Sequence, residues 1–342
     1  MTAQTHMYRE IREIPDATRR LLGQGREAIE AAADDLRQSA PLFISTVARG
    51  SSDHAATFFK YASELTTGLP VASIGPSIAS IYGAELQLGK SACISISQSG
   101  QSPDIVKMTQ SSNNQGALTV AITNDAESPL AKASKHTILI HAGTERSVAA
   151  TKTFVTSAVA GLALLAHWTQ DKVLIEAIDN LPEHLENAIT HDWQELRHAL
   201  GDRGSLFVLG RGPSYAMSNE AALKFKETCQ IHAESYSSAE VLHGPVSIVE
   251  PGYPVLAFAS RDASEDSIVS VADKLARQGA VTFISSDRAQ HAARLGFTKT
   301  SHPLTDPLAL IVSFYAFIER LAVARGINPD MPRNLKKVTE TV

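Results

Sequence analysis

The chain has 342 residues, about twice the length of a typical ~150-residue domain, so two domains are expected. Hydrophobic residues make up 44% and charged residues 20%, which excludes a disordered or collagen-like protein. The net charge of −5 argues against a dedicated nucleic-acid-binding protein, which would usually carry a basic excess. It leaves anionic substrates open, because hydroxyls and backbone N–H groups can hold a phosphate without lysine or arginine.

The two cysteines, Cys93 and Cys229, lie far apart and show no spacing typical of metal sites. Neither a disulfide framework nor a zinc site is therefore expected. The first ten residues lack the apolar core of a secretory signal, and the apolar stretch 154–168 is too short to span a bilayer. These features predict a cytoplasmic protein without a membrane segment.

Short Val/Ile/Leu-rich runs alternate with helical patterns along most of the chain. After a helical segment over 1–35, they predict strands over 42–47, 71–74, 92–97, 118–123 and 137–140. After linking helices over 166–200, a second set is predicted over 205–209, 254–259, 280–285 and, weakly, near 297–300. Apolar strands that alternate with helices are typical of parallel sheets covered on both faces. The fold class is therefore α/β, with two doubly wound domains over 36–165 and 201–330 and a tail over 331–342.

A short motif recurs at a fixed distance. Arg49-Gly50-Ser51-Ser52 follows the first predicted strand, and Arg211-Gly212-Pro213-Ser214 follows an equivalent run 162 residues later. The same offset relates a second pair of strand ends, at 122–125 and 284–287. Two matches at one offset indicate a duplicated unit.

The loop after the strand over 92–97 is suited to binding a phosphate. It contains Ser97, Gln98, Ser99 and Gly100, and Ser102 and Pro103 fit the cap and first position of a helix. A helix N-terminus attracts anions, and ligands of doubly wound sheets bind beyond the carboxyl ends of the strands. The alternative is an ordinary serine-rich turn. The second copy has Ala-Ser-Arg-Asp at 259–262 instead, so one pocket per chain is expected.

Candidate acid–base groups lie in the second half. Glu220, Lys224 and Glu227 are spaced i, i+4 and i+7, which places them on one face of a helix. Taken alone, this spacing favours ion pairs on a solvated face; the alternative is a general base tuned by a neighbouring ammonium. His243 precedes a Gly-Pro turn, where an imidazole could transfer protons near neutral pH. Taken by itself, the basic tail containing Lys337 is typical of a solvated chain end.

Taken together, the motifs resemble the sugar isomerase (SIS) family, most closely the isomerase half of glucosamine-6-phosphate synthase. The resemblance covers nearly the whole chain and rests on residues 8–15, 97–100, 142–145, 148–152, 220–227, 243–245 and 332–337. It implies two tandem SIS domains, each a flavodoxin-like three-layer sandwich.

Two departures from the synthase pattern bear on function. The synthase has a glutaminase domain with a nucleophilic cysteine after the initiator methionine, whereas this sequence has Thr2 and shows no such domain. The resemblance therefore implies the reverse reaction, that of SIS-type glucosamine-6-phosphate deaminases, which release ammonia and fructose 6-phosphate. The second departure is Arg49, where the family has a cysteine in a Cys-Gly-Thr-Ser loop. It concerns the sugar contacts rather than the phosphate loop.

The resemblance also implies roles for individual residues. Glu227 would move a proton between C2 and C1, supported by Glu220 and Lys224. His243 would open the sugar ring from across a homodimer interface, and Lys337 would act as a Schiff-base or electrostatic lysine. The remaining candidates bind substrate: the phosphate would be held by Ser97, Gln98, Ser99 and Ser102, and the sugar by Gly50, Ser51, Ser52, Val148, Ala149 and Ala150. Neither a metal nor a cofactor is implied.

Other functions stay open at this stage. The same chemistry could act on galactosamine 6-phosphate or on fructosamine 6-phosphates, or stop at aldose–ketose isomerisation. A non-catalytic sugar-phosphate-binding regulator is a further alternative, but the joint presence of Glu227, His243 and Lys337 favours an enzyme. The expected partners are a phosphorylated amino sugar and a second copy of the chain, without nucleic acid or membrane.

Overall fold

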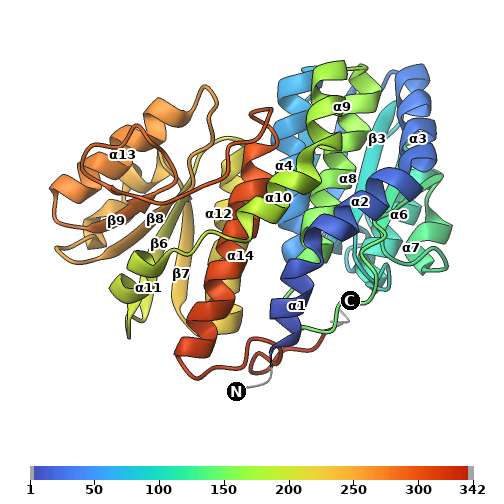
Figure 1. Ribbon diagram of the computed structural model, residues 1–342. Coiled ribbons are helices and arrows are strands. Elements are labelled where there is room, and N and C mark those ends of the chain that lie inside the picture. Colours follow the sequence, from blue (N-terminus) through green and yellow to red (C-terminus); the bar gives the residue numbers. More distant parts are fainter. Residues whose placement is uncertain (1–3, 338–342) are drawn as a thin grey trace. The chain divides into compact units, whose positions relative to one another are not determined.

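The computed structural model describes residues 4–337 and contains two five-stranded parallel sheets (Figure 1). The chain divides into two compact units. The first unit comprises Glu13–Glu145, Ala150–Pro182 and residues 335–337. The second comprises residues 4–12, Arg146–Ala149 and Glu183–Asn334.

The sheet of the first unit has the order β2-β1-β3-β4-β5, and all of its pairings are parallel. Its strands are β1 (Phe43–Val47), β2 (Val71–Ser73), β3 (Ser91–Ile96), β4 (Leu118–Thr123) and β5 (His136–Leu139). Every residue of β3 and β4 is buried, as expected for central strands covered on both faces. The helices of this unit are α2 (Ile14–Gln24), α3 (Arg26–Ser39), α4 (Ser51–Thr67), α5 (Ser77–Ser80), α6 (Pro103–Asn114), α7 (Pro129–Ala133), α8 (Lys152–Thr169) and α9 (Lys172–Asp179).

The sheet of the second unit repeats this topology. Its order is β7-β6-β8-β9-β10, so in both sheets the first strand lies between the second and the third. The strands are β6 (Ser205–Gly210), β7 (His232–Ser237), β8 (Pro254–Ala257), β9 (Val281–Ile284) and β10 (Ala293–Arg294). The helical segments are α1 (His6–Arg12), α10 (Leu181–Ala188, which begins in the first unit), α11 (Gln194–Leu200), α12 (Pro213–Cys229), η1 (Glu240–His243), η2 (Pro245–Ile248), α13 (Glu265–Arg277) and α14 (Asp306–Ala324). The predicted α/β class with two parallel sheets is confirmed.

The duplication predicted from the sequence is also visible in the backbone. Gly50 precedes α4 with φ 55° and ψ −134°, and Gly212 precedes α12 with φ 55° and ψ −135°. Both glycines follow the first strand of their sheet and adopt a positive φ that side chains rarely tolerate. The two copies therefore share the same strand–helix turn.

The predictions for two strands were wrong. β7 was missed because its sequence, His-Ala-Glu-Ser-Tyr-Ser, lacks an apolar run; it is an edge strand that is mostly only half-buried. The run 297–300 is not a strand, and the edge is formed by β10 instead. The side chains of that run bond elsewhere: Thr298 contacts His191 at 2.9 Å, and Thr300 donates to Asp306 at 2.7 Å.

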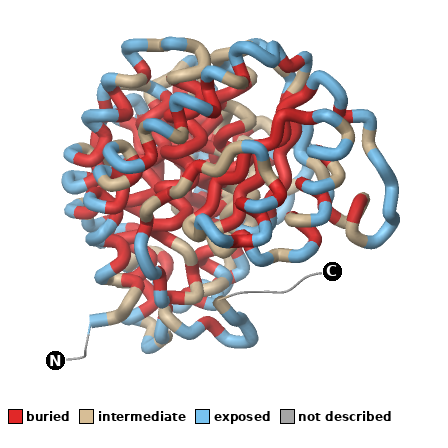
Figure 2. Tube along the Cα trace, turned by 90° about the vertical axis from the view of Figure 1, so that its right-hand side faces the viewer, coloured by how far each residue is buried: buried red, intermediate tan, exposed pale blue. Residues whose placement is uncertain are grey.

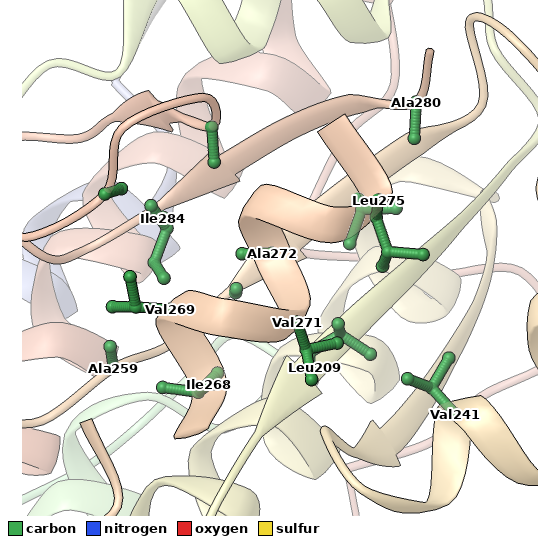
Figure 3. Packing of buried hydrophobic residues seen from close by; sticks show 14 of the residues in the cluster. Leu209, Val241, Ala259, Ile268, Val269, Val271, Ala272, Leu275, Ala280 and Ile284 are labelled. Atoms are coloured by element: carbon green, nitrogen blue, oxygen red, sulfur yellow. The ribbon is translucent and has the colours of Figure 1, made fainter. Parts of the chain in front are cut away.

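Each unit has an apolar interior. In the second unit, Ile268, Ala272 and Leu275 on α13 belong to one buried cluster with Leu209 and Ile284 of the sheet (Figure 3). Figure 2 shows buried residues along the interior segments and exposed ones at the outer turns.

One helix, α14, is long and apolar enough to cross a membrane by length and composition, yet 83% of its apolar window is buried inside the protein. It packs against α12 through the rings of Phe314 and Phe225, whose centroids are 5.2 Å apart. It therefore packs as a core helix.

Candidate functional site

The loops that follow β1, β3, β4 and β5 meet at one edge of the first sheet. These strands are parallel neighbours, so their carboxyl ends lie side by side, where doubly wound sheets bind their ligands. A cleft of about 590 Å³ opens within the first unit. It is lined by Arg20, Gln24, Gln98, Ser99, Asn124, His141, Gly143, Thr144, Glu145 and Lys337.

The loop after β3 is folded around Gly100. This residue has φ 60°, and a Cβ there would lie 2.3 Å from the Ser128 hydroxyl, so only glycine fits. The Gly100 N–H donates to both the carbonyl and the hydroxyl of Ser97, each at 3.2 Å. The Ser97 side chain is therefore buried in the turn, whereas Gln98 and Ser99 face the cleft.

The same loop leads directly into α6. Ser102 occupies the N-cap with φ −64° and ψ 114°, and Pro103 follows it, as the sequence predicts. The Ser102 hydroxyl does not cap the helix, and the Ser99 hydroxyl accepts a bond from the Gln101 N–H at 3.3 Å. The helix has 12 residues, so its N-terminal N–H groups present a partial positive charge beside the two serines.

Arg49 connects the loop after β1 to the start of α6. Its Nε and Nη2 donate to Asp104 Oδ2 at 3.0 and 2.9 Å. Asp104 is fully buried, while the Arg49 side chain is about half exposed. The arginine therefore fixes the Gly50–Ser52 turn next to the phosphate loop.

Asn124 joins two of the loops at the cleft. Its backbone N–H donates to the Gln98 carbonyl at 3.0 Å, and its side chain bonds Gly143 O at 2.9 Å and Ala142 N at 3.0 Å. Sequence reasoning noted Asn124 at a strand end without giving it a role. Its position at the carboxyl end of β4 is the signal that could have identified it.

Lys337 reaches the cleft and pairs with a buried carboxylate. Its Nζ lies 2.7 Å from Glu145 Oε2, and Glu145 also accepts bonds from Thr151 N at 3.0 Å and from Thr153 Oγ1 at 2.6 Å. Burial disfavours an ionised Glu145, but the Lys337 ammonium and these donors outweigh it and lower the pKa of Glu145. Glu145 was not predicted as a site residue, although it lies in the motif over 142–145.

The segment before Ala150 is held by two carboxylic residues of the second unit. Glu10 on α1 accepts bonds from the backbone N–H groups of Arg146 and Ser147, the latter at 3.2 Å to Oε2. The Val148 N–H donates to the Asp330 carbonyl at 3.2 Å. The residues predicted to contact the sugar come next in the chain. Of these, Val148 and Ala150 are half-buried, and Ala149 is buried.

Glu220, Lys224 and Glu227 form a buried charge cluster on α12. The side chains of Glu220 and Lys224 are fully buried, and that of Glu227 is 17% exposed. Lys224 Nζ contacts Glu227 Oε2 and lies 3.4 Å from Glu220 Oε1. Burial opposes the ammonium, but the two carboxylates raise the pKa of Lys224 above its usual value. The interpretation as a solvated face, which the spacing alone favours, is therefore wrong. The cluster is internal, and of its three members only Glu227 reaches the surface.

His243 ends η1 and is exposed, and Gly244 follows it with φ 151°. His243 and the charge cluster belong to the second unit, whereas the phosphate loop and Lys337 belong to the first. Within residues 4–337, no group of three or more His, Cys, Asp or Glu residues is placed to hold a metal ion.

Comparison with known proteins places these features in a family. The sequence profile of the SIS domain matches residues 40–167 and 199–318. A glutamine–fructose-6-phosphate aminotransferase (isomerizing) from Thermococcus kodakarensis is 31% identical to this chain. The match covers 97% of this chain and 57% of that enzyme, so the chain spans little more than half the length of the curated relatives that it matches.

Solved structures agree with this match. A chain from Silicibacter pomeroyi DSS-3, described as a candidate phosphosugar isomerase, is 60% identical, with a TM-score of 0.94 over 96% of this chain and 100% of that one. The C-terminal domain of glucosamine-fructose-6-phosphate aminotransferase from Francisella tularensis is 25% identical, with a TM-score of 0.79 over 97% of this chain and 99% of that one. The chain therefore belongs to the SIS domain family and carries two SIS domains in tandem.

Proposed function

We propose that the protein is a glucosamine-6-phosphate deaminase, which converts glucosamine 6-phosphate and water to fructose 6-phosphate and ammonia. The observation that carries the proposal is the position of Glu227. It is the one member of the buried cluster that reaches the surface, and it is ion-paired with Lys224. A carboxylate placed at the edge of a buried site can meet a substrate and remove a proton from carbon.

The cleft of the first unit supports a sugar-phosphate substrate. Its volume of about 590 Å³ falls within the range of small-molecule sites. Gln98, Ser99 and Ser102 with the α6 N-terminus would bind the phosphate, and the Gly50–Ser52 turn would bind sugar hydroxyls. The ammonium of Lys337 lines the same cleft and would attract the dianion.

The proposed chemistry needs only groups of the chain and water. His243 assists opening of the ring, which exposes the C1 aldehyde. Glu227 removes the C2 proton and returns it to C1, while the C2 ammonium gives one of its protons to O1. The aldehyde thereby becomes a CH2OH group and C2 becomes an iminium. Water adds to C2 and gives a proton to the nitrogen. The C–N bond then breaks, ammonia leaves, and C2 becomes the carbonyl carbon of the ketose.

The relatives support nitrogen chemistry at this site. By name, they combine an amino group with fructose 6-phosphate and isomerise the product. The proposed reaction runs the same isomerisation in reverse. Water adds to the carbon from which the nitrogen leaves. We further propose a cytoplasmic homodimer in which the exposed His243 serves the partner's site.

A second candidate is aldose–ketose isomerisation of a phosphosugar without loss of ammonia. It is favoured by the 60% identical chain from Silicibacter pomeroyi, which is described as a candidate phosphosugar isomerase. The two reactions share the proton transfer by Glu227 and differ in whether a C–N bond breaks.

A substrate panel separates these functions. The full chain would be incubated with glucosamine 6-phosphate, galactosamine 6-phosphate, a fructosamine 6-phosphate and glucose 6-phosphate, and ammonia and ketose phosphate would be measured. We expect equal amounts of ammonia and fructose 6-phosphate from glucosamine 6-phosphate. Ketose from glucose 6-phosphate without ammonia from any amino sugar would support the second candidate, and no product from any substrate would refute both.

Two variants test the assigned residues. Glu227→Gln should lower ammonia release by at least about 100-fold, whereas Glu195→Gln, on the exposed surface of α11, should leave it unchanged. Mixing Glu227→Gln with His243→Ala subunits should restore part of the activity if the site is shared between copies. No restoration would argue against the shared site.

A further inference from the structure

The charge cluster on α12 has a fourth member that no sequence motif indicates. Tyr315 lies on α14, is fully buried, and donates its hydroxyl proton to Glu220 Oε1 at 2.9 Å. The same oxygen lies 3.4 Å from Lys224 Nζ. A hydrogen-bonded series therefore runs from Tyr315 through Glu220 and Lys224 to Glu227.

The Lys224 ammonium does not contact the two carboxylates equally closely. Lys224 makes a short contact with Glu227 and a longer one, 3.4 Å, with Glu220. Glu220 is fully buried, so its charge must be stabilised by protein groups rather than by water. The Tyr315 hydroxyl supplies one of these stabilising contacts, and Lys224 can then lie closer to Glu227.

The other ionisable residues on the strands and helix packed against α12 have partners outside the cluster. They are His232, Glu234 and Tyr236 on β7, which interact among themselves, and Asp306, Glu319 and Arg320 on α14, which contact Arg261, Thr5 and Asp192. β6 carries no ionisable side chain. Among the ionisable groups described on these elements, Lys224 is therefore the cation that contacts Glu227, and it also contacts Glu220.

We propose that Tyr315 is a positioning residue for proton transfer: its bond to Glu220 keeps the Lys224 ammonium on Glu227 and so sets how strongly Glu227 holds a proton. The inference rests on the proposed role of Glu227 as the base. Without the hydroxyl, the Glu220 carboxylate loses one of its stabilising contacts and draws Lys224 closer to itself. Glu227 then loses part of its cationic neighbour and becomes protonated at higher pH.

The packing around Tyr315 makes a clean test possible. Phe314 and Phe225 stack edge to face at 5.2 Å between α14 and α12, and the ring of Tyr315 is itself fully buried in this interior. Tyr315→Phe removes one oxygen and keeps the ring. Tyr253→Phe is the matched control, because it removes a tyrosine hydroxyl of the same unit that bonds Ser205 at 3.1 Å, away from the cluster.

The test follows the pH dependence of kcat/KM for ammonia release. In Tyr315→Phe we expect the acid limb to move up by about one pH unit, so activity below that limb falls about tenfold, while KM at the optimum stays within twofold. Tyr253→Phe should leave the limb in place. Equal loss at every pH in both variants would show that Tyr315 has only a structural role and would overturn the inference.

A direct titration keeps the inference separate from the proposed function. In protein labelled with 13C at the glutamate carboxyls, the Glu227 signal is identified by its absence in Glu227→Gln. Its midpoint should rise in Tyr315→Phe and fall in Glu220→Gln, where Lys224 has only Glu227 to pair with. Unchanged midpoints would refute the inference, whereas shifted midpoints in a protein that releases no ammonia would refute only the proposed function.

Discussion

Lys337 Nζ lies 2.7 Å from Glu145 Oε2, although 192 residues separate the two in the chain. Glu145 is fully buried and Lys337 is 27% exposed, so the pair joins a surface segment to an interior carboxylate at the edge of the cleft. This contact determines how the site should respond to acid and to loss of the lysine.

The stability of the protein should fall in acid partly through Glu145. Its pKa is lowered in the folded state, so the stabilisation that it contributes is complete above its unfolded value, about 4.3, and is lost as pH falls through the folded pKa. Lys337→Ala removes the main cationic partner and should lower the free energy of unfolding at pH 7 by about 1–3 kcal/mol. Thermal unfolding at pH 7, 4 and 3 measures both effects, and Lys336→Ala, at an exposed position, is the control. Identical unfolding of the two variants would contradict the role of the pair.

The phosphate loop should not tolerate a side chain at Gly100. Gly100→Ala combines a strained φ of 60° with a Cβ 2.3 Å from the Ser128 hydroxyl, so the loop must move. We expect KM for the sugar phosphate to rise at least about tenfold. Gly116→Ala is the control, because Gly116 also has a positive φ, 85°, but nothing within 4 Å of the added Cβ. If both variants change stability alone, the loop does not bind the phosphate.

Arg49 should be essential for the fold of its loop, unlike its counterpart in the second copy. Arg49→Cys introduces the cysteine found in the synthase loop but leaves the fully buried Asp104 without its cation. We expect a loss of about 2 kcal/mol in unfolding free energy, less than for a wholly buried pair because Arg49 is half exposed. Arg211→Cys should cost far less, since within residues 4–337 the interaction found for Arg211 is a 3.4 Å bond to Ser237. Urea unfolding compares the two, and equal losses would contradict this account.

Glu10 should affect substrate binding from a distance. It holds the N–H groups of Arg146 and Ser147 and so fixes the start of the predicted sugar-binding segment over 148–150. Glu10→Gln should raise KM for the sugar phosphate several-fold and destabilise the fold by about 1–3 kcal/mol. Glu27→Gln, an exposed glutamate on α3, should do neither. Destabilisation with an unchanged KM would assign Glu10 a structural role only.

Local sequence patterns predicted the interior strands well and the edges poorly. β1, β3 and β4 are rich in apolar residues, interrupted only by serines and threonines, because both faces of the sheet are covered, and this pattern is readable without tertiary information. β7 is polar and lies at an edge, so nothing in its own sequence marks it. The phosphate loop was predictable because its serines, its glycine and the helix that follows are adjacent in the chain.

The charged parts of the site could not be predicted in the same way. Whether the face of α12 with Glu220 and Lys224 meets water or protein depends on α14, whose Tyr315 follows 95 residues after Glu220. The partners of Glu145 and Glu10 are likewise set by contacts between distant segments. Such residues become recognisable only once the fold has brought these segments together.

The interleaving of the two units has a consequence for biosynthesis. The chain passes from one unit to the other five times, and the last segment of the first unit, which holds Lys337, begins only at Leu335. On the ribosome, the first sheet can therefore form early, but its cleft gains its lysine only after the whole second unit has been translated. Fragments cut at the midpoint of the sequence would each lack a segment of their own unit, so neither half of the sequence contains one whole unit.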